Sequence, residues 1–126
     1  MKVLTIKEPW ASLIINGYKM YEFRSWKTKY RGKILIHAGM TLEKDMAERF
    51  SSYNLNYYKG EIIGEATLVD CILVDEEFNK KLRDTNPLIY GKSNHVETYA
   101  WKLENICKYY QPIKVKGKLG LWNYEK

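Results

Sequence analysis

The sequence is poor in the residues that build metal centres and redox sites. Its 126 residues include two cysteines, Cys71 and Cys107, and two histidines, His37 and His95. None of them stands at the short spacing of a zinc site or a redox pair, so we expect no metal ion and no cofactor. Both cysteines lie in apolar, strand-like segments, which predicts buried free thiols in a reducing compartment.

A long apolar run is also missing. The sequence has no stretch of about 18 apolar residues and no apolar core of the signal-peptide type at its N-terminus. We therefore expect a cytoplasmic protein with no membrane partner. Internal repeats and low-complexity segments are absent as well. Because a chain of this size commonly has one hydrophobic core, we expect a single domain over residues 1–126.

Charge, in contrast, is abundant and unevenly distributed. Lys and Arg number 21 against 15 Asp and Glu, which gives a formal net charge of +6. Residues 19–33 carry six basic side chains and one acidic one, whereas residues 41–86 carry ten acidic and six basic ones. A strongly basic segment beside an acidic half favours an anionic partner, although a run of charge is also typical of an ordinary solvated surface.

Hydrophobic periodicity predicts short strands with helices between them. Strands are expected at residues 3–6, 19–24, 33–37, 61–74, 99–104, 113–115 and 121–122, and helices at 9–16, 41–50 and 75–83. Thr41 is expected to cap the second helix. Gly64 is expected to bend the longest strand, which must curl in so small a domain. Since short loops join the C-terminal strands, we expect an α+β fold: a small, mixed and largely antiparallel β-barrel with two or three flanking helices.

Polar groups gather directly after the stop of the first helix. Tyr21 and Phe23 alternate with Glu22 and Arg24, which predicts a strand with its aromatic side chains inside and its charged ones outside. Lys19 has the parity of the buried side. It can join Glu22 and Arg24 only if the preceding turn redirects it.

Six motifs extend along nearly the whole chain. They are Glu8-Pro9-Trp10-Ala11 with Leu13-Ile14, Gly17-x-Lys19-x-x-Glu22-x-Arg24, Tyr30-Arg31-Gly32 with Ile36-His37-Ala38, Tyr99-Ala100-Trp101-x-Leu103-Glu104-Asn105, Pro112-Ile113-x-Val115-x-Gly117 and Gly120-Leu121-Trp122. In this order they resemble the ASCH domain family, a branch of the PUA-like barrels. The resemblance implies a β-barrel with a cleft beside the first helix, lined by the Gly-x-Lys-x-x-Glu-x-Arg segment, and an RNA-related role.

The family's members differ in activity. Some resemble nucleic-acid-binding modules or parts of coactivators, some act as ribonucleases, and one bacterial branch deacetylates acetylcytidine. That branch is similar at Lys19 but has a threonine where this chain has Glu22, and it lacks the C-terminal tryptophan motifs. Its separate catalytic glutamate matches no position in this chain.

Lys19 and Glu22 are the catalytic candidates, as nucleophile or base and as proton carrier, with Arg24 as a phosphate clamp. A lysine is a nucleophile at neutral pH only if its pKa is lowered, and a neighbouring carboxylate raises that pKa. This conflict favours binding over catalysis. Glu22 and Arg24 are equally compatible with a structural ion pair.

The basic segment behind these residues combines aromatic rings with cations, as single-stranded nucleic acid requires. We therefore expect an RNA- or modified-nucleoside-binding module that uses Lys19, Glu22, Arg24, Trp26, Tyr30 and Arg31. The alternatives are a small hydrolase that acts on RNA phosphodiesters or acetylated cytidine through Lys19 and Glu22, and an interaction domain whose basic face binds an acidic protein. The oligomeric state stays open. Secondary candidates for ligand contacts are Ser93 and Asn94. Four lysines at positions 108, 114, 116 and 118 are compatible with an extended phosphate contact but more typical of solvated edge strands. Trp10 and Tyr18 are compatible with a place in the cleft but more typical of a core.

Overall fold

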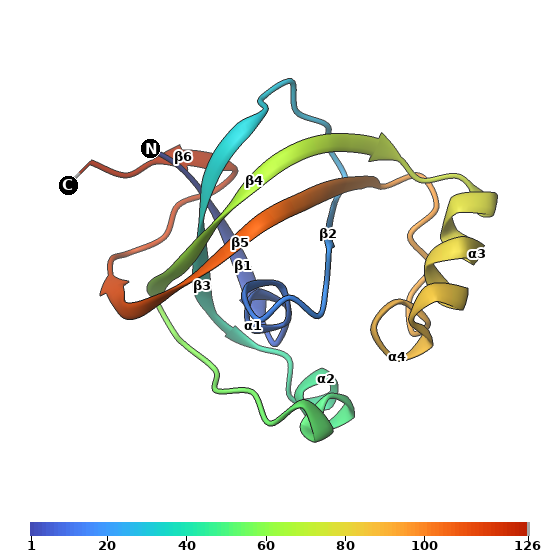
Figure 1. Ribbon diagram of the computed structural model, residues 1–126, viewed down its shortest axis with the longest axis horizontal. Helices are drawn as coiled ribbons and strands as arrows, with labels where there is room; N and C mark the ends of the chain where they lie inside the picture. Colours follow the sequence, from blue (N-terminus) through green and yellow to red (C-terminus); the bar gives the residue numbers. More distant parts are fainter. Residues whose placement is uncertain (126) are drawn as a thin grey trace.

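The computed structural model describes residues 1–125 as one curled sheet with short helices around its open side (Figure 1). The six strands are ordered β2-β5-β4-β3-β1-β6. Neighbouring strands are antiparallel except β1 and β3, which run parallel with α1 and β2 between them in the chain. The elements are β1 Lys2–Glu8, α1 Trp10–Ile15, β2 Tyr21–Arg24, β3 Gly32–Leu42, α2 Lys44–Arg49, the 3-10 turn η1 Ser51–Tyr53, β4 Glu61–Leu73, α3 Glu76–Thr85, α4 Pro87–Tyr90, β5 Tyr99–Lys114 and β6 Leu121–Asn123.

The sheet curls because its two longest strands are irregular. Strands β4 and β5 have 13 and 16 residues, and their pairing shifts register at three places. Such bulges bend a strand and increase its twist. Gly64 lies at one of the shifts, where a Cβ atom would collide with the Ile15 side chain and the Cys107 carbonyl. The bend expected at Gly64 is therefore confirmed, and the result is a barrel-like sheet.

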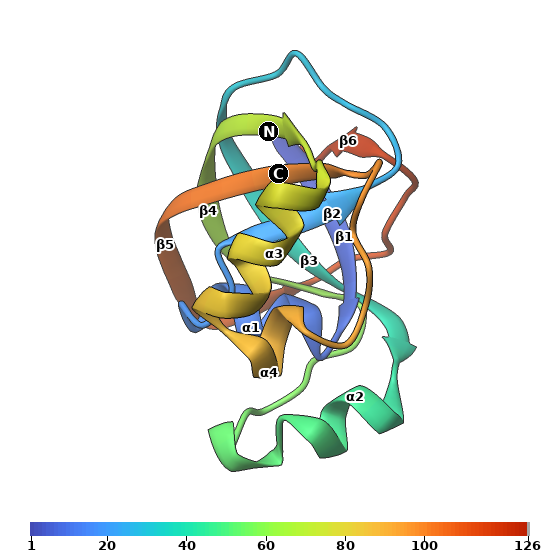
Figure 2. The same ribbon diagram turned by 90° about the vertical axis from the view of Figure 1, so that its right-hand side faces the viewer.

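The hydrophobic core fills the inside of this sheet and surrounds α1. The helix buries Ala11, Ile14 and Ile15 against β1, β3 and β4, beside the fully buried Trp101 of β5. A second cluster around Leu13 joins α1 to the segment after α2 and to α3 and α4. Figure 2 shows α3 and α4 packed in front of α1 and β2. Within residues 1–125, no helix is long and apolar enough to cross a membrane.

Several of the expected elements are wrong in their boundaries. Strand β3 continues to Leu42, which pairs with Glu8 of β1, so Thr41 lies in a strand and does not cap a helix. Helix α2 begins only at Lys44. The two strands expected at 99–104 and 113–115 form one strand, β5, because the residues between them are accommodated as bulges against β4. The first helix has six residues, since it begins after Pro9.

The two cysteines are free thiols, but the expectation that both are buried is wrong. Cys71 is half-buried and Cys107 is exposed. Cys107 lies opposite Glu65 in the pairing of β4 and β5, next to polar side chains. Apolar neighbours in the sequence therefore did not place this thiol in the core, because side chains of a strand alternate between its two faces.

Candidate functional site

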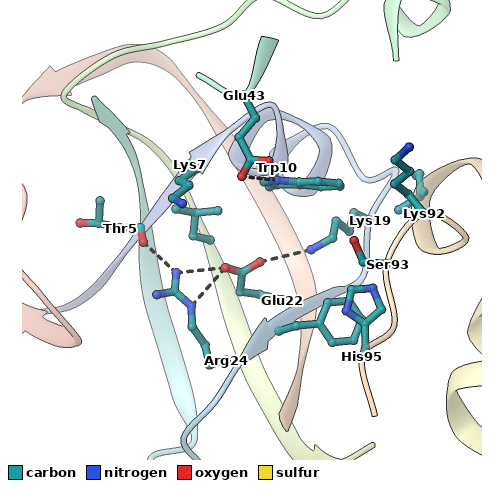
Figure 3. Close-up of a pocket in the computed structure, with 13 residues that line it drawn as sticks. Thr5, Lys7, Trp10, Lys19, Glu22, Arg24, Glu43, Lys92, Ser93 and His95 are labelled. Atoms are coloured by element: carbon teal, nitrogen blue, oxygen red, sulfur yellow. Dashed lines mark hydrogen bonds and ion pairs between the residues drawn. The ribbon is translucent and has the colours of Figure 1, made fainter. Parts of the chain in front are cut away.

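A hydrogen-bonded turn directs Lys19 into the molecule. Gly17 ends α1 with a φ of +83°, a left-handed conformation that glycine adopts easily. The backbone N–H groups of Tyr18 and Lys19 then both donate to the carbonyl of Leu13, at 2.9 and 3.1 Å. The chain reverses here before β2 begins, so Lys19 does not follow the alternation of the strand. Its side chain points toward Glu22 (Figure 3), and only 4% of the residue is exposed.

Glu22 lies between two basic side chains. Its Oε1 accepts a hydrogen bond from Lys19 Nζ at 3.2 Å, and its Oε2 lies 3.1 Å from Arg24 Nε and 3.0 Å from Arg24 Nη2. Arg24 Nη2 also donates to the carbonyl oxygen of Thr5 at 2.8 Å. This last contact connects β2 to β1 across the open side of the sheet, where the described residues form no ladder between the two strands.

The expected orientation of β2 is partly wrong. Glu22 is buried, with 8% of the residue exposed, whereas Tyr21, Phe23 and Arg24 are half-buried. Alternation within the strand holds, but both of its faces are covered. Glu22 and Arg24 face the inside of the curled sheet, and the two aromatic rings pack against α3, α4 and the loop that follows α4.

Burial dominates the protonation of Lys19. Desolvation lowers the pKa of Lys19 from 10.5, and the positive charge of Arg24 adds to this, while the charge and hydrogen bond of Glu22 act in the opposite direction. The rings of Trp10 and Phe23, centred 5.3 and 5.1 Å from Nζ, also favour the cation. The net result is a lowered pKa. The nearby carboxylate of Glu22, which the sequence reveals, is thus outweighed by the burial of Lys19, which the sequence does not reveal.

These side chains line a pocket of about 360 Å³. Its walls come from β1, α1, β2, the residue before α2 and the loop after α4 (Figure 3). Trp10 forms one side and donates through Nε1 to Glu43 at 3.4 Å. The exposed residues Lys7, Lys92 and Ser93 lie at its solvent side. The volume lies within the range of small-molecule sites, about 300–1,000 Å³.

His95 closes the side of the pocket opposite β1. Its imidazole stacks on the Phe23 ring with 3.7 Å between centroids and 8° between planes. Burial, followed by the nearby charge of Lys19, lowers the pKa of His95 from 6.5 to about 4, so the ring is neutral at pH 7. In the sequence His95 is a lone histidine in a polar loop, and no local pattern indicates its contact with Phe23.

A model of the ASCH domain family matches residues 4–116 of the chain. The protein belongs to the ASCH domain family. Two curated relatives are similar to this ASCH domain: Activating signal cointegrator 1 of Homo sapiens, 33% identical over 136 residues, and that of Mus musculus, 31% identical over 134 residues. Both alignments cover 97% of this chain but only 22% of the relative, so the chain spans about a fifth of the relatives' length.

Solved structures are similar to the ASCH domain over most of its length. The crystal structure of an ASCH protein from Zymomonas mobilis superposes with a TM-score of 0.58, at 18% identity, over 90% of this chain and 72% of the other. A mutant form of that protein superposes with a TM-score of 0.54. At such identity the likeness concerns the fold alone. The predicted family and the α+β, PUA-like architecture are thus confirmed.

The other three nucleic-acid-binding candidates lie in the loop between β2 and β3 of the ASCH domain, outside the described pocket lining. Trp26 packs edge-on against Trp101, with ring centroids 4.8 Å apart. The Tyr30 hydroxyl donates to a backbone carbonyl at 2.6 Å. Arg31 donates to two loop carbonyls and lies 3.8 Å from Asp70. The structure therefore groups Lys19, Glu22 and Arg24 and separates them from this basic loop.

The secondary candidates are also divided. Ser93 lines the pocket, as does Trp10, whereas Asn94 caps its own loop by accepting from Val96. Tyr18 packs on Tyr53 at 4.4 Å. Among the four C-terminal lysines, Lys108 donates to Asn16, the C-cap residue of α1, at 3.3 Å. Groups of three His, Cys, Asp or Glu side chains placed to hold a metal ion do not occur in the described part of the chain.

The neutral His95 predicts a pH dependence of stability. The unfolded chain protonates this histidine below about 6.5, and the folded domain only below about 4. Its contribution to stability is therefore complete above pH 6.5 and is lost as the pH falls toward 4. Glu8, whose pKa is raised mainly by burial, acts in the opposite direction. Its effect cancels when two proteins that both contain Glu8 are compared.

We therefore expect His95→Phe to lose less stability than the wild type between pH 6.5 and 4, with a ring retained against Phe23. Urea unfolding of both proteins at pH 7, 5.5 and 4 measures the difference. Parallel losses in the two proteins would contradict a neutral, buried imidazole.

Proposed function

We propose that this ASCH domain binds RNA or a modified nucleoside and holds one nucleoside in the pocket between β1, α1 and β2. The observation that supports this most is the combination of flat rings and hydrogen-bond donors in one small pocket. Trp10 and the stacked Phe23 and His95 provide ring faces. An aromatic ring that stacks on a base contributes roughly 1–3 kcal/mol of binding free energy.

The donors favour a ligand that is rich in acceptors or negative charge. A guanidinium has five N–H groups, and those at Nε and Nη2 of Arg24 already bind Glu22 and Thr5. Contacts within residues 1–125 leave Nη1 of Arg24 for a ligand. Lys7 and Lys92 add positive charge at the solvent side. Base carbonyls and a phosphate group are the parts of a nucleotide that such donors bind.

In this proposal the basic loop between β2 and β3 binds the rest of the strand. The loop follows Arg24 directly, so an RNA with one nucleoside in the pocket has a short path to it. Trp26 is 38% exposed and available for stacking, and Lys27, Lys29 and Arg31 are exposed cations. We assign Trp26, Tyr30 and Arg31 to this outer contact. We also retain a cytoplasmic location and a single domain over residues 1–126 as parts of the proposal.

The salt dependence of RNA binding tests the proposal and distinguishes the contribution of the pocket lysines from that of the basic loop. Binding of a short single-stranded RNA is expected to weaken with salt, with a slope of about −0.7 in log K against log salt for each neutralised phosphate. The double variant Lys7→Met with Lys92→Met is expected to make the slope shallower by about 0.7 to 1.4. A filter-binding titration between low and physiological salt measures these slopes.

Two matched double variants complete that experiment. Lys27→Met with Lys29→Met measures the contribution of the loop, and Lys80→Met with Lys81→Met on α3 serves as a control because both lysines are exposed and remote from the pocket. The control should leave the slope unchanged. RNA binding that is undetectable, or that does not vary with salt, would refute the proposal.

A small hydrolase is the second candidate, and one observation favours it. Lys19 and Glu22 lie 3.2 Å apart, and burial lowers the pKa of the lysine as a general base or nucleophile requires. The substrates would be RNA phosphodiesters or acetylated cytidine. Purified wild-type protein and Lys19→Ala are incubated with labelled RNA and with acetylcytidine. Equal turnover by both proteins would remove Lys19 from the mechanism.

A protein partner is the third candidate, since the two curated relatives carry the name signal cointegrator. An acidic partner on the basic loop should be displaced by single-stranded RNA if both use the same cations. Unchanged partner binding at saturating RNA would place the two contacts on different surfaces.

A further inference from the structure

We propose that Lys19 captures small anionic aldehydes or ketones as an imine, so that the pocket has a covalent, carbonyl-binding activity beyond reversible nucleoside binding. The proposal depends on the pocket and on Lys19, and it does not depend on which nucleoside the domain binds.

The charges around Glu22 give the first reason to expect a neutral, nucleophilic amine at Lys19. One carboxylate faces two basic groups, Lys19 Nζ at 3.2 Å and Arg24 Nη2 at 3.0 Å. An arginine in a protein keeps its proton, so Arg24 remains the cation that balances Glu22. The proton of Lys19 is the one that can be released without leaving Glu22 unpaired. Lys19 is therefore placed to be a neutral amine that donates a hydrogen bond to the Glu22 carboxylate.

The burial of Lys19 gives the second reason to expect a neutral amine. With 4% of the residue exposed, its amine is placed beside the rings of Trp10 and Phe23, and the neighbouring imidazole of His95 is neutral. The loss of water around the amine disfavours the ammonium form, against the attraction of the rings and of Glu22, and the net result is a lowered pKa of Lys19. Lysines that react with carbonyl groups are activated in this way, by desolvation and by a nearby cation.

The charge of the pocket selects the class of carbonyl compound. Lys7, Arg24 and Lys92 line the same cavity as Lys19, against the carboxylates of Glu22 and Glu43, and this excess of basic side chains favours a ligand with a phosphate or carboxylate group. The cavity of about 360 Å³ limits that ligand to a small molecule. An anionic aldehyde can thus place its charge at the exposed lysines while its carbonyl reaches Nζ.

The reaction needs no oxidant or reductant. The Nζ lone pair attacks the carbonyl carbon to form a C–N bond, and Glu22 carries a proton from the nitrogen to the carbonyl oxygen, which gives a carbinolamine. The C–O bond then breaks as the second N–H proton passes through Glu22 to the departing oxygen. Both hydrogens of the amine leave with that oxygen as one water molecule, and a C=N bond remains.

Pyridoxal 5′-phosphate, which carries an aldehyde and a phosphate, is the probe. The full chain is incubated with it at pH 7, imines are reduced with borohydride, and peptide mass mapping gives the labelling rate of each lysine. We expect Lys19 to be labelled at least about tenfold faster than the exposed Lys27 and Lys29, because an ordinary lysine with a pKa of about 10.4 is almost fully protonated at pH 7. Between pH 6 and 9 the labelling of a fully protonated lysine rises about tenfold per pH unit, and that of Lys19 should rise less. Labelling of Lys19 at the rate of Lys27 or below would overturn the proposal.

Two variants provide a control. Lys19→Arg retains a basic side chain but has no nucleophilic amine, and Lys29→Arg makes the same change at an exposed position. The fast phase of labelling should disappear in Lys19→Arg and persist in Lys29→Arg; a fast phase that persists in Lys19→Arg would also overturn the proposal. The mapping of the wild type stands even if Lys19→Arg fails to fold. Protection of Lys19 by RNA bears on the proposed function separately, since fast labelling without protection supports carbonyl capture and argues against RNA in the pocket.

Discussion

Replacing Glu22 with glutamine is expected to destabilise the ASCH domain by about 3 kcal/mol, whereas replacing Lys19 with methionine is expected to cost about 1 kcal/mol or less. The difference follows from the charges that remain buried in each variant. Without Glu22, Arg24 and Lys19 face each other in a buried site with no counter-ion. Without Lys19, the carboxylate and Arg24 remain a balanced pair, and methionine fills the space of the lysine stem.

Urea unfolding of the three proteins at pH 7 measures this asymmetry. The exposed ion pair between Lys80 and Asp84 on α3 provides the control, because Asp84→Asn should change the stability by no more than about 0.5 kcal/mol. Equal losses for Glu22→Gln and Lys19→Met would show that the three side chains do not act as one charge-balanced unit.

Replacing Trp101 with alanine is expected to cost about 4 kcal/mol, the largest effect of a single core substitution that we predict. The residue is fully buried inside the curled sheet. It pairs with Glu22 across β2 and β5, and its ring packs edge-on against that of Trp26, with 4.8 Å between the ring centroids. A cavity at this position would therefore loosen both the strand that presents Glu22 and the basic loop.

Tyr110 on the same strand is the matched control, since it is 98% exposed. Tyr110→Ala should stay within about 0.5 kcal/mol of the wild type. Thermal and urea unfolding of both variants give the comparison. A small loss for Trp101→Ala would mean that the space around this ring collapses without cost, and that β2 does not depend on it.

The sequence predicted the fold through patterns that are local. Alternation and apolar runs located the strands, and Gly64 and Gly17 were correctly assigned to a bend and to the end of the first helix. The predicted ends of helices and strands are wrong where a long-range contact decides them. Leu42 belongs to β3 because it pairs with Glu8, 34 positions away, and no feature near Thr41 reveals this pairing.

The candidate site was predicted only in part, because local patterns reveal residues that are close in the sequence but not residues from distant elements. Lys19, Glu22 and Arg24 lie close together in the sequence, and the structure places them in one pocket. Thr5, Glu43 and His95 come to that pocket from distant elements, so only the fold assembles them with the motif. Burial of Glu22 was missed because alternation within a strand says which side chains share a face, but not whether that face is covered.

The four tryptophans provide the most direct test of the central claim that the pocket beside α1 is the nucleic-acid site. Each gives one indole N–H signal in a proton–nitrogen NMR spectrum: Trp10 in the pocket, Trp26 in the basic loop, Trp101 in the core and Trp122 in β6. On titration with a short single-stranded RNA, we predict that the Trp10 signal shifts most and that the Trp122 signal, whose N–H donates to Thr5 Oγ1, shifts less. A shift confined to Trp26, with Trp10 unchanged at saturation, would contradict the claim.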